Sequence, residues 1–352
     1  MYQLIMRYLL PNSSSHSIRL VKRLSLLVGA LSALTLFTGC RNVANNDASL
    51  VSSDKVVRSA YASLEELFQT EIINIGLEQL GYTPLTGSEL EYDVIHQAIG
   101  RNYLDYTAVH WYPIHKDFFE ENGGHTTFKR LEPVVENALQ GYLIDKRTAT
   151  ENNINGLPDL QDPEIARLFD TDGNGKANLI GCPHGWACRG VIESHLDGHN
   201  LRDTVEQDSH DYNASMAKVI KRYEAGEPVL YFTWTPLWVS SVLEPDQDVV
   251  WLDVPPLGPE QNASIVDGKN LGFEINHIHI LASRDFLKEN SDIAQWFEVV
   301  NIPITDVSLQ NQRMRDGENS PKDIRHHAEE WVRNNQGTFD NWLEDAKRAA
   351  KK

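Results

Sequence analysis

The sequence predicts an α/β protein with largely parallel sheets, divided into two lobes. Strand-like and helical stretches alternate along most of the chain, a pattern that favours helices packed against parallel strands. The chain has 352 residues. Because domains commonly hold ~150 residues, this length favours two lobes over a single core.

The first 39 residues predict an export signal. A basic cluster at residues 19–23 precedes an apolar run over 24–37 that is too short to span a bilayer comfortably. Small residues and then Cys40 follow, which resembles the end of a bacterial lipoprotein signal. We expect Cys40 to carry lipid and to be the only attachment to a membrane. An ordinary secretory signal cut near Gly39 is the alternative, because the leader is long and Phe37 replaces the usual aliphatic residue.

Either signal would place the mature protein in the periplasm or cell envelope. Polar residues over 40–55 then predict a flexible tether. Residues 1–39 hold four basic residues and no acid, so the net charge of −18 becomes −22 after cleavage. A nucleic-acid partner would need clustered Lys and Arg, and this composition argues against one.

The folded part is predicted to begin with a short strand at residue 56. Residues 63–66, Ser-Leu-Glu-Glu, have the form of a capping box, in which the serine and the last glutamate would satisfy free amides of a helix. Apolar residues recur at helical spacing over 64–75, and Gly81 ends that helix.

Two later stretches repeat one local pattern. A strand-like run over 106–110 leads into Trp111-Tyr112-Pro113, and another over 229–233 leads into Trp234-Thr235-Pro236. Because proline suits the first turn of a helix, each pattern predicts a strand, then Trp, then a helix. Both tryptophans would lie just past the carboxyl ends of strands, where open α/β sheets bind ligands. Two aromatic side chains of the core are the alternative.

The segment GCPHGWAC at 181–188 lies at a third strand-to-helix turn, between a strand at 178–180 and a helix at 191–196. Free amides at the start of that helix would form an anion site. Outside the cytosol, Cys182 and Cys188 favour a structural disulfide that would hold Trp186 in place. A zinc site would need four ligands at a more usual spacing, and a redox pair is more often C-x-x-C.

Three tryptophans and an anion site predict a ligand with a bulky cation at one end and a carboxylate at the other. Aromatic cages suit quaternary ammonium groups, which have no N–H to satisfy. His115 follows Trp111 by four residues, so on a helical turn it would face the same way and could donate to the carboxylate. A core or surface histidine is the plainer interpretation of His115 alone.

These motifs resemble those of the ProX-type glycine betaine/proline betaine-binding proteins, the solute receptors of an ABC importer. The matching stretches are WYPIH, GCPHGWAC and YFTWTP, together with QGYLIDK, LFDTDGNGKANL and VVWLDVP. The resemblance covers nearly all of the chain from about residue 56. It implies a two-lobed periplasmic-binding-protein fold of type II with two chain crossings and the ligand in the cleft. Lobe 1 would comprise 56–139 and 255–352, and lobe 2 would comprise 140–254.

The resemblance also implies the site residues. The ammonium box would be Trp111, Trp186 and Trp234, the carboxylate contacts would be His115 and the backbone amides of Ala187 and Cys188, and Cys182 would be bonded to Cys188. Ala187 stands where the family often has glycine, a change that keeps the amide but adds a methyl group.

We therefore expect a monomeric, non-enzymatic receptor for glycine betaine, and for proline betaine, that serves an ABC permease in osmoprotectant import. Receptors for choline, carnitine or ectoine are alternatives, although choline has no carboxylate for the anion site. A thiol oxidoreductase outside the cytosol, using Cys182 and Cys188, is the alternative of a different class.

One segment matches the first half of a calcium loop, with Asp170, Asp172 and Asn174 as candidate ligands. The twelfth position of that loop is Gly181, so the bidentate acid is missing. We favour an Asx-rich turn here, and we expect no other metal or cofactor.

Overall fold

The computed structural model describes residues 55–87, 89–258 and 264–351. The expected signal at 1–39, the lipidation at Cys40 and nearly all of the tether at 40–55 lie outside the described residues. Within the described part, none of the helices combines the length and the apolar character that crossing a membrane would require.

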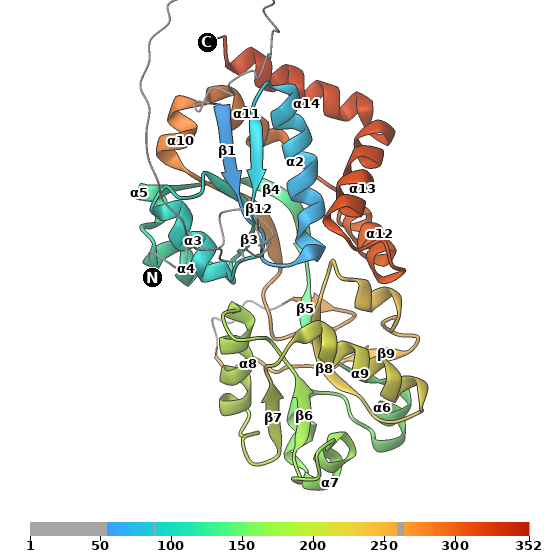
Figure 1. Cartoon of the computed structure of the whole chain (residues 1–352). Helices are drawn as coiled ribbons and strands as arrows, with labels where there is room; N and C mark the ends of the chain where they lie inside the picture. Colours follow the sequence, from blue (N-terminus) through green and yellow to red (C-terminus); the bar gives the residue numbers. More distant parts are fainter. Residues whose placement is uncertain (1–54, 88, 259–263, 352) are drawn as a thin grey trace, which may run out of the picture. The chain divides into compact units, whose positions relative to one another are not determined.

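Residues 55–352 form one compact unit that contains two five-stranded sheets (Figure 1). The first sheet has the order β2-β1-β3-β12-β4 and the second has the order β7-β6-β8-β5-β9. The strands of the first are β1 (Val56–Ser59), β2 (Thr83–Thr86), β3 (Tyr106–Tyr112), β4 (Phe128–Ala138) and β12 (Asn276–Ser283). Those of the second are β5 (Gln140–Asp145), β6 (Ala177–Ile180), β7 (Val205–Asp208), β8 (Leu230–Trp234) and β9 (Val249–Trp251).

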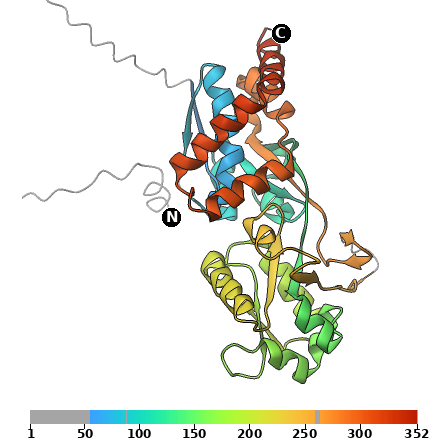
Figure 2. The same ribbon diagram turned by 90° about the vertical axis from the view of Figure 1, so that its right-hand side faces the viewer.

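Helices surround each sheet, as the alternating pattern predicts. Those of the first lobe are η2 (Leu64–Glu66), α2 (Leu67–Gln79), α3 (Tyr92–Gly100), α4 (Lys116–Glu121), α5 (Gly124–Thr127), α10 (Arg284–Glu289), α11 (Ser291–Val299), α12 (Ile304–Arg315), α13 (Pro321–Asn334) and α14 (Gln336–Ala349). Those of the second are α6 (Lys146–Asn152), η3 (Leu157–Gln161), α7 (Pro163–Ala166), η4 (Arg167–Phe169), α8 (Ala187–Gly198), α9 (Tyr212–Glu224) and η5 (Trp238–Ser241). Figure 2 shows the C-terminal helices beside α2, and α13 contacts α2 directly.

The sheets are mixed, which corrects the expectation of largely parallel pairing. Strands β2, β1 and β3 pair in parallel, as do β7, β6 and β8. Strand β12 runs antiparallel to both of its neighbours, and so does β5. Parallel neighbours within a sheet need a long crossover connection. The link between the two sheets is much shorter, because a single residue separates the end of β4 in the first sheet from the start of β5 in the second.

The chain crosses between the lobes twice. The first crossing lies between β4 in the first sheet and β5 in the second. Before the second crossing, Leu271 and Phe273 pack in the hydrophobic clusters of the second sheet, and only then does β12 begin. A small hairpin of β10 (Ile265–Val266) and β11 (Lys269–Asn270) precedes them. We propose that lobe 2 extends to about residue 275, past the expected boundary at 254.

Buried aromatic side chains fix the local packing of the first lobe. Trp296 is fully buried, and its ring lies so close to α2 that a Cβ atom at Gly76 would overlap it. The indole N–H of Trp296 donates to the carbonyl oxygen of Ile73 at 3.2 Å. The glycine in the middle of α2 is therefore required by the close approach of α11.

Two local predictions are wrong in detail. Ser63 is the N-cap of η2 but makes no side-chain cap, so the predicted capping box does not form. Pro113 and Pro236 do not open helices; each follows a cis peptide bond, and the next helices begin at Lys116 and Trp238. The predicted strands at 56, 106, 178 and 229 and the helix ending before Gly81 are confirmed within one or two residues.

Candidate functional site

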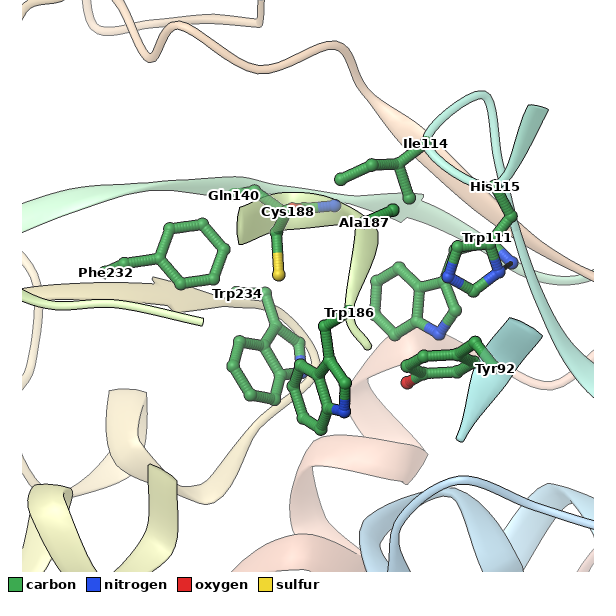
Figure 3. A pocket seen from close by; sticks show the side chains of 10 residues that line it. All are labelled: Tyr92, Trp111, Ile114, His115, Gln140, Trp186, Ala187, Cys188, Phe232 and Trp234. Atoms are coloured by element: carbon green, nitrogen blue, oxygen red, sulfur yellow. Dashed lines mark hydrogen bonds between the residues drawn. The ribbon is translucent and has the colours of Figure 1, made fainter. Parts of the chain in front are cut away.

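A pocket with about 320 Å³ of space free of protein atoms lies between the two lobes (Figure 3). One part of its lining, the first-lobe wall, consists of Tyr92, Trp111, Ile114 and His115. The other part, the second-lobe wall, consists of Gln140, Trp186, Ala187, Cys188, Phe232 and Trp234. All six residues predicted to bind a ligand therefore line one pocket, although they come from stretches far apart in the sequence.

Trp111 is the best-anchored residue of the first-lobe wall. It is the penultimate residue of β3, and its side chain is 6% exposed. Its indole N–H donates to the Oε1 atom of Glu66 at 2.7 Å. Its backbone N–H donates to the Nδ1 atom of His115 at 3.1 Å. Hydrogen bonds thus fix both the indole N–H and the backbone N–H of Trp111.

His115 has a defined tautomer. Because Nδ1 accepts the backbone N–H of Trp111, the remaining proton of a neutral ring is on Nε2. Burial, and to a smaller degree the neighbouring His96, lowers the pKa of His115 well below its usual range. A neutral His115 can therefore donate one hydrogen bond from Nε2, which is the role that the sequence predicts for it.

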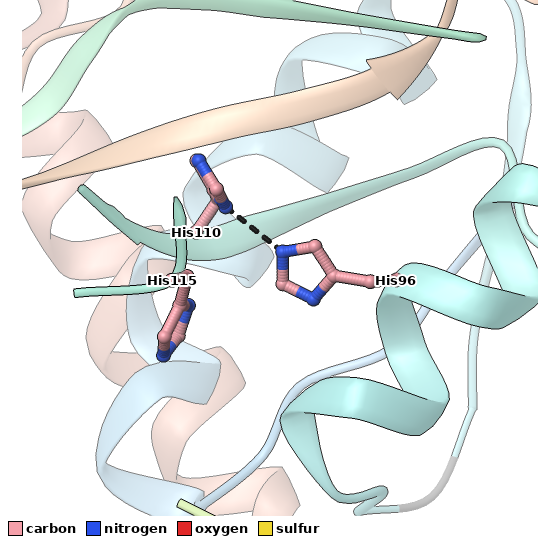
Figure 4. A group of neighbouring side chains, drawn as sticks. All are labelled: His96, His110 and His115. Carbon is pink, nitrogen blue, oxygen red and sulfur yellow. Dashed lines mark hydrogen bonds between the residues drawn. The ribbon is translucent and has the colours of Figure 1, made fainter. Parts of the chain in front are cut away.

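His96, His110 and His115 form a buried cluster in which one ring nitrogen of each lies within 4.8 Å of the others (Figure 4). Three imidazoles could hold a metal ion. The hydrogen bonds favour another arrangement. His96 Nδ1 lies 2.6 Å from the carbonyl oxygen of Tyr92, so its proton is on Nδ1 and its Nε2 accepts from His110 Nδ1 at 2.9 Å. With His115 protonated on Nε2, the cluster does not offer three free lone pairs to one point.

Burial keeps the other two histidines of the cluster neutral. It lowers the pKa of His96 to about 4 and that of His110 well below its usual range. The T-shaped contact of His96 with His115, at 5.5 Å between ring centroids, then supports the His115 ring from behind. The cluster is best described as packing that orients His115.

The second-lobe wall is built around a disulfide between Cys182 and Cys188, whose Cα atoms are 6.0 Å apart. Both cysteines are buried, which argues against an accessible redox pair. Trp186 lies inside the closed ring as the N-cap residue of α8, without a side-chain cap. The helix therefore begins at Ala187, earlier than the predicted residue 191, and its first amides, on Ala187 and Cys188, have no acceptor within the helix.

Trp234 is the last residue of β8 and is held by ring packing. Its ring centroid lies 5.3 Å from that of Trp186, at an interplanar angle of 68°. Tyr212 lies 4.7 Å away, and Phe232 lies 6.0 Å away. Trp234 and Trp186 therefore meet nearly edge to face and form one corner of the pocket.

Tyr92 closes the pocket from the first lobe, and the sequence did not predict this role. Its ring lies 5.6 Å from Trp186 in a T-shaped contact across the cleft and 4.4 Å from His115. Its hydroxyl donates to Glu66 at 2.8 Å. Tyr92 begins a helix that carries no recognisable motif, so no local signal would have revealed it. The sequence motifs also gave no ligand-binding role to three other lining residues, although each lies within one of them: Ile114 in WYPIH, Gln140 in QGYLIDK and Phe232 in YFTWTP.

The loop with Asp170, Asp172 and Asn174 uses its side-chain oxygens within itself. Asp170 accepts from the amides of Asp172, Gly173 and Gly175. Asp172 accepts from the Asn174 amide, and Asn174 accepts from the amide of Lys176. The segment thus forms the expected Asx-rich turn.

The fold and the pocket define a class: a two-lobed solute-binding protein with its site between the lobes. A family profile described as the substrate binding domain of ABC-type glycine betaine transport system matches residues 55–334. The chain belongs to this family.

Two relatives with high sequence identity over most of this chain are glycine betaine-binding proteins by name. The glycine betaine-binding periplasmic protein OusX of Dickeya dadantii (strain 3937) is 43% identical over 292 residues, which cover 82% of this chain and 88% of the relative. The glycine betaine/proline betaine-binding periplasmic protein of Escherichia coli (strain K12) is 42% identical over 291 residues, with the same coverage of 82% and 88%.

A solved structure shows the fold. The glycine betaine, L-proline ABC transporter binding protein ProX of Borrelia burgdorferi matches with a TM-score of 0.66 at 19% identity. The match covers 82% of this chain and 96% of that structure. The expected type II two-lobed fold is thus confirmed.

Proposed function

We propose that this protein is a receptor outside the cytosol that binds glycine betaine, and also proline betaine, and delivers them to an ABC permease for osmoprotection. The observation that carries the proposal is the convergence of three indole rings and a helix start on one pocket. Family membership and the names of the relatives support the same ligand class.

The three tryptophans suit the cationic end of such a ligand. A quaternary ammonium has no N–H group, so burying it leaves no donor without an acceptor. The faces of indole rings attract it through their electron density, by an amount of about 2 kcal/mol or more when the site is desolvated. We assign Trp111, Trp186 and Trp234 to this end.

Neutral donors suit the carboxylate end. The amides of Ala187 and Cys188 lie at the positive end of the α8 dipole, where an anion is stabilised. His115 would add one charge-assisted hydrogen bond from Nε2. Because neither wall places an Arg or Lys in the pocket lining, these donors would bind a zwitterion without adding net positive charge beside its ammonium.

Titration calorimetry with glycine betaine, dimethylglycine, sarcosine and glycine tests the proposal. All four share a carboxylate, so they differ only at nitrogen. Each lost methyl group exposes an N–H that an indole face satisfies far less well than water does, and it also leaves a gap against the rings. The affinity should therefore fall about tenfold or more per step. Comparable affinity for glycine and glycine betaine would contradict the aromatic box. Tight binding of choline would contradict the carboxylate site.

We also propose that the mature protein is monomeric and attached to the membrane through lipid on Cys40. Mass spectrometry of the protein isolated from membranes tests the lipidation. A lipid adduct on an N-terminal Cys40 is the expected result. An unmodified Cys40, or an N-terminus elsewhere, would favour the ordinary secretory signal.

A further inference from the structure

A buried carboxylate lies directly behind the first-lobe wall. Glu66 is 5% exposed and lies at the end of η2. Its Oε1 atom accepts from the indole N–H of Trp111 at 2.7 Å and from the Tyr92 hydroxyl at 2.8 Å. Its Oε2 atom accepts from the backbone N–H of Ala62 at 3.3 Å. One carboxylate thus joins two of the aromatic rings that line the pocket.

Glu66 has no cationic partner among the described residues, since none of the ion pairs found there includes it. A buried charge without a counter-ion is costly, and proteins tend to retain one only where something depends on it. The neighbouring titratable groups do not supply the missing positive charge. They are Glu65 on η2, Glu91 and Tyr92 at the start of α3, and His115 before α4.

The ligand proposed above would supply that charge. An indole N–H that donates to a carboxylate shifts electron density toward the ring, which strengthens the attraction of its face for a cation. The carboxylate would also attract the cation through space, and because Glu66 and Trp111 are buried, solvent would screen this attraction poorly. The negative charge behind the rings is therefore complementary to an ammonium group in front of them.

We propose that Glu66 is a positioning residue of this site, whose carboxylate fixes the Trp111 and Tyr92 rings and provides the buried negative charge that a quaternary ammonium neutralises. The inference rests on the proposed function, because it names how that site recognises a cation. It extends the site to a residue that does not line the pocket.

A pH dependence follows from the surroundings of Glu66. Burial, opposed by the hydrogen bonds from Trp111 and Tyr92, raises the pKa of Glu66 to about 7. The cation favours the ionised form, so affinity should rise as the pH increases through 7. Tyr92 and His115 stay neutral over this range, because burial raises the pKa of Tyr92 well above its usual range and lowers that of His115. The ligand's carboxylate stays ionised throughout.

The test compares the mature wild-type protein with Glu66→Gln and with Glu65→Gln as the matched control. Glutamine keeps the size of Glu66 and one acceptor but removes the charge. At about pH 8, Glu66→Gln should raise the Kd for glycine betaine about tenfold, the scale of losing one charge-assisted interaction. Wild type should lose about as much affinity between pH 8 and pH 5.5, whereas the Glu66→Gln variant should show a flat profile. Glu65→Gln should keep an affinity close to that of wild type at about pH 8 and a pH-dependent loss of similar size, with its midpoint moved to lower pH, because the charge of Glu65 helps to raise the pKa of Glu66.

Tryptophan fluorescence of the ligand-free proteins separates this inference from the proposed function. Protonation of Glu66 should shift the emission of ligand-free wild type near pH 7. Glu66→Gln should abolish this transition, and the result does not depend on which ligand the protein binds. If wild type binds glycine betaine but Glu66→Gln changes neither affinity nor the pH profiles, the inference is overturned and the proposed function stands. If wild type does not bind glycine betaine, the proposed function fails instead.

A second variant covers the case in which Glu66→Gln does not fold. Tyr92→Phe removes one of the two side-chain donors and leaves the carboxylate and both rings in place. With one stabilising hydrogen bond lost, the pKa of Glu66 should rise, so the fluorescence transition should move to higher pH. An unmoved transition would overturn the assignment of that titration to Glu66.

Discussion

The two Trp-x-Pro corners of the pocket begin from nearly the same sequence pattern but are stabilised in different ways. At the first-lobe corner, Trp111 is bound through hydrogen bonds by Glu66 and His115. At the second-lobe corner, Trp234 is partly exposed and packs against Tyr212 and Trp186. Trp111 is the penultimate residue of β3 and Trp234 is the last residue of β8, and each stands two residues before a cis proline.

The difference shows that a repeated local pattern fixes where a side chain lies but not what holds it. The first-lobe corner is polar behind its ring and carries ionisable groups. The second-lobe corner is aromatic and is made rigid by a disulfide close by. A ligand between the two corners would meet an indole ring backed by a carboxylate on one side and an indole ring backed by other aromatic rings on the other. Changes at the two corners should therefore have different effects.

Trp111→Ala and Trp234→Ala should give the largest contrast. Both should weaken glycine betaine binding by roughly 1–3 kcal/mol, because each removes one face of the box. Trp111→Ala should also cost about 3–5 kcal/mol of unfolding free energy, since it leaves a cavity and removes a donor from buried Glu66. Trp234 is less buried, so its loss should destabilise less.

Denaturant unfolding and calorimetry on these two variants check the contrast. Trp238→Ala is the control, because Trp238 packs against the hydrophobic cluster of the second lobe outside the pocket lining. It should lower stability with little effect on affinity. Equal stability losses for Trp111→Ala and Trp234→Ala would remove the distinction between the two corners.

Removing the disulfide tests the rigidity of the second-lobe wall. The double variant Cys182→Ser, Cys188→Ser should lose roughly 2 kcal/mol of stability, the chain-entropy value for so short a loop. It should also weaken ligand binding, because Trp186 and the α8 amides would then have to be ordered on binding. Thermal unfolding and calorimetry measure the two effects. An unchanged Kd would mean that the bridge stabilises the fold alone.

The assigned roles of the two His115 nitrogens can be tested with two substitutions, His115→Asn and His115→Gln, because each amide side chain takes the place of one ring nitrogen. His115→Asn can still accept the Trp111 amide near the position of Nδ1, but it lacks a donor where Nε2 lies. His115→Gln offers that donor instead. Loss of the ligand hydrogen bond should weaken glycine betaine binding about tenfold in His115→Asn and less in His115→Gln. Calorimetry that ranks the variants in the opposite order would refute the assigned tautomer.

Ala187→Gly should give the smallest effect. The substitution keeps the backbone amide and removes only a methyl group from the pocket lining. Gly at the first helical turn costs up to about 1 kcal/mol of stability. The Kd for glycine betaine should change by no more than about threefold, the scale of a single methyl contact. A large gain in affinity would show that the methyl group obstructs the site.

Much of the second-lobe wall could be predicted from the sequence, because its signals are local. Cys182, Trp186 and Cys188 fall within seven residues, and the strand and helix that flank them have clear patterns. Export then favours the disulfide on chemical grounds alone. Trp234 likewise ends a strand whose apolar run is plain in the sequence.

Glu66 illustrates what the sequence could not show. Its spacing from Ser63 predicts a capping residue at the start of a helix, and local reasoning offers nothing better. Its actual partners lie 26 and 45 positions away along the chain. No periodicity relates residues at such distances, so only the packing of η2 and α3 against β3 decides the outcome.

The sequence by itself predicted the class of fold, the positions of Trp111 and Trp234 near strand ends and the pairing of Cys182 with Cys188, because these depend on patterns of residues that are near neighbours in the chain. The tertiary structure alone decided the antiparallel strands, the place of Tyr92 in the pocket and the role of Glu66. The physical reason is common to all of these: a buried polar group must find its partner wherever the fold brings one within about 3 Å. That partner need not be near in sequence.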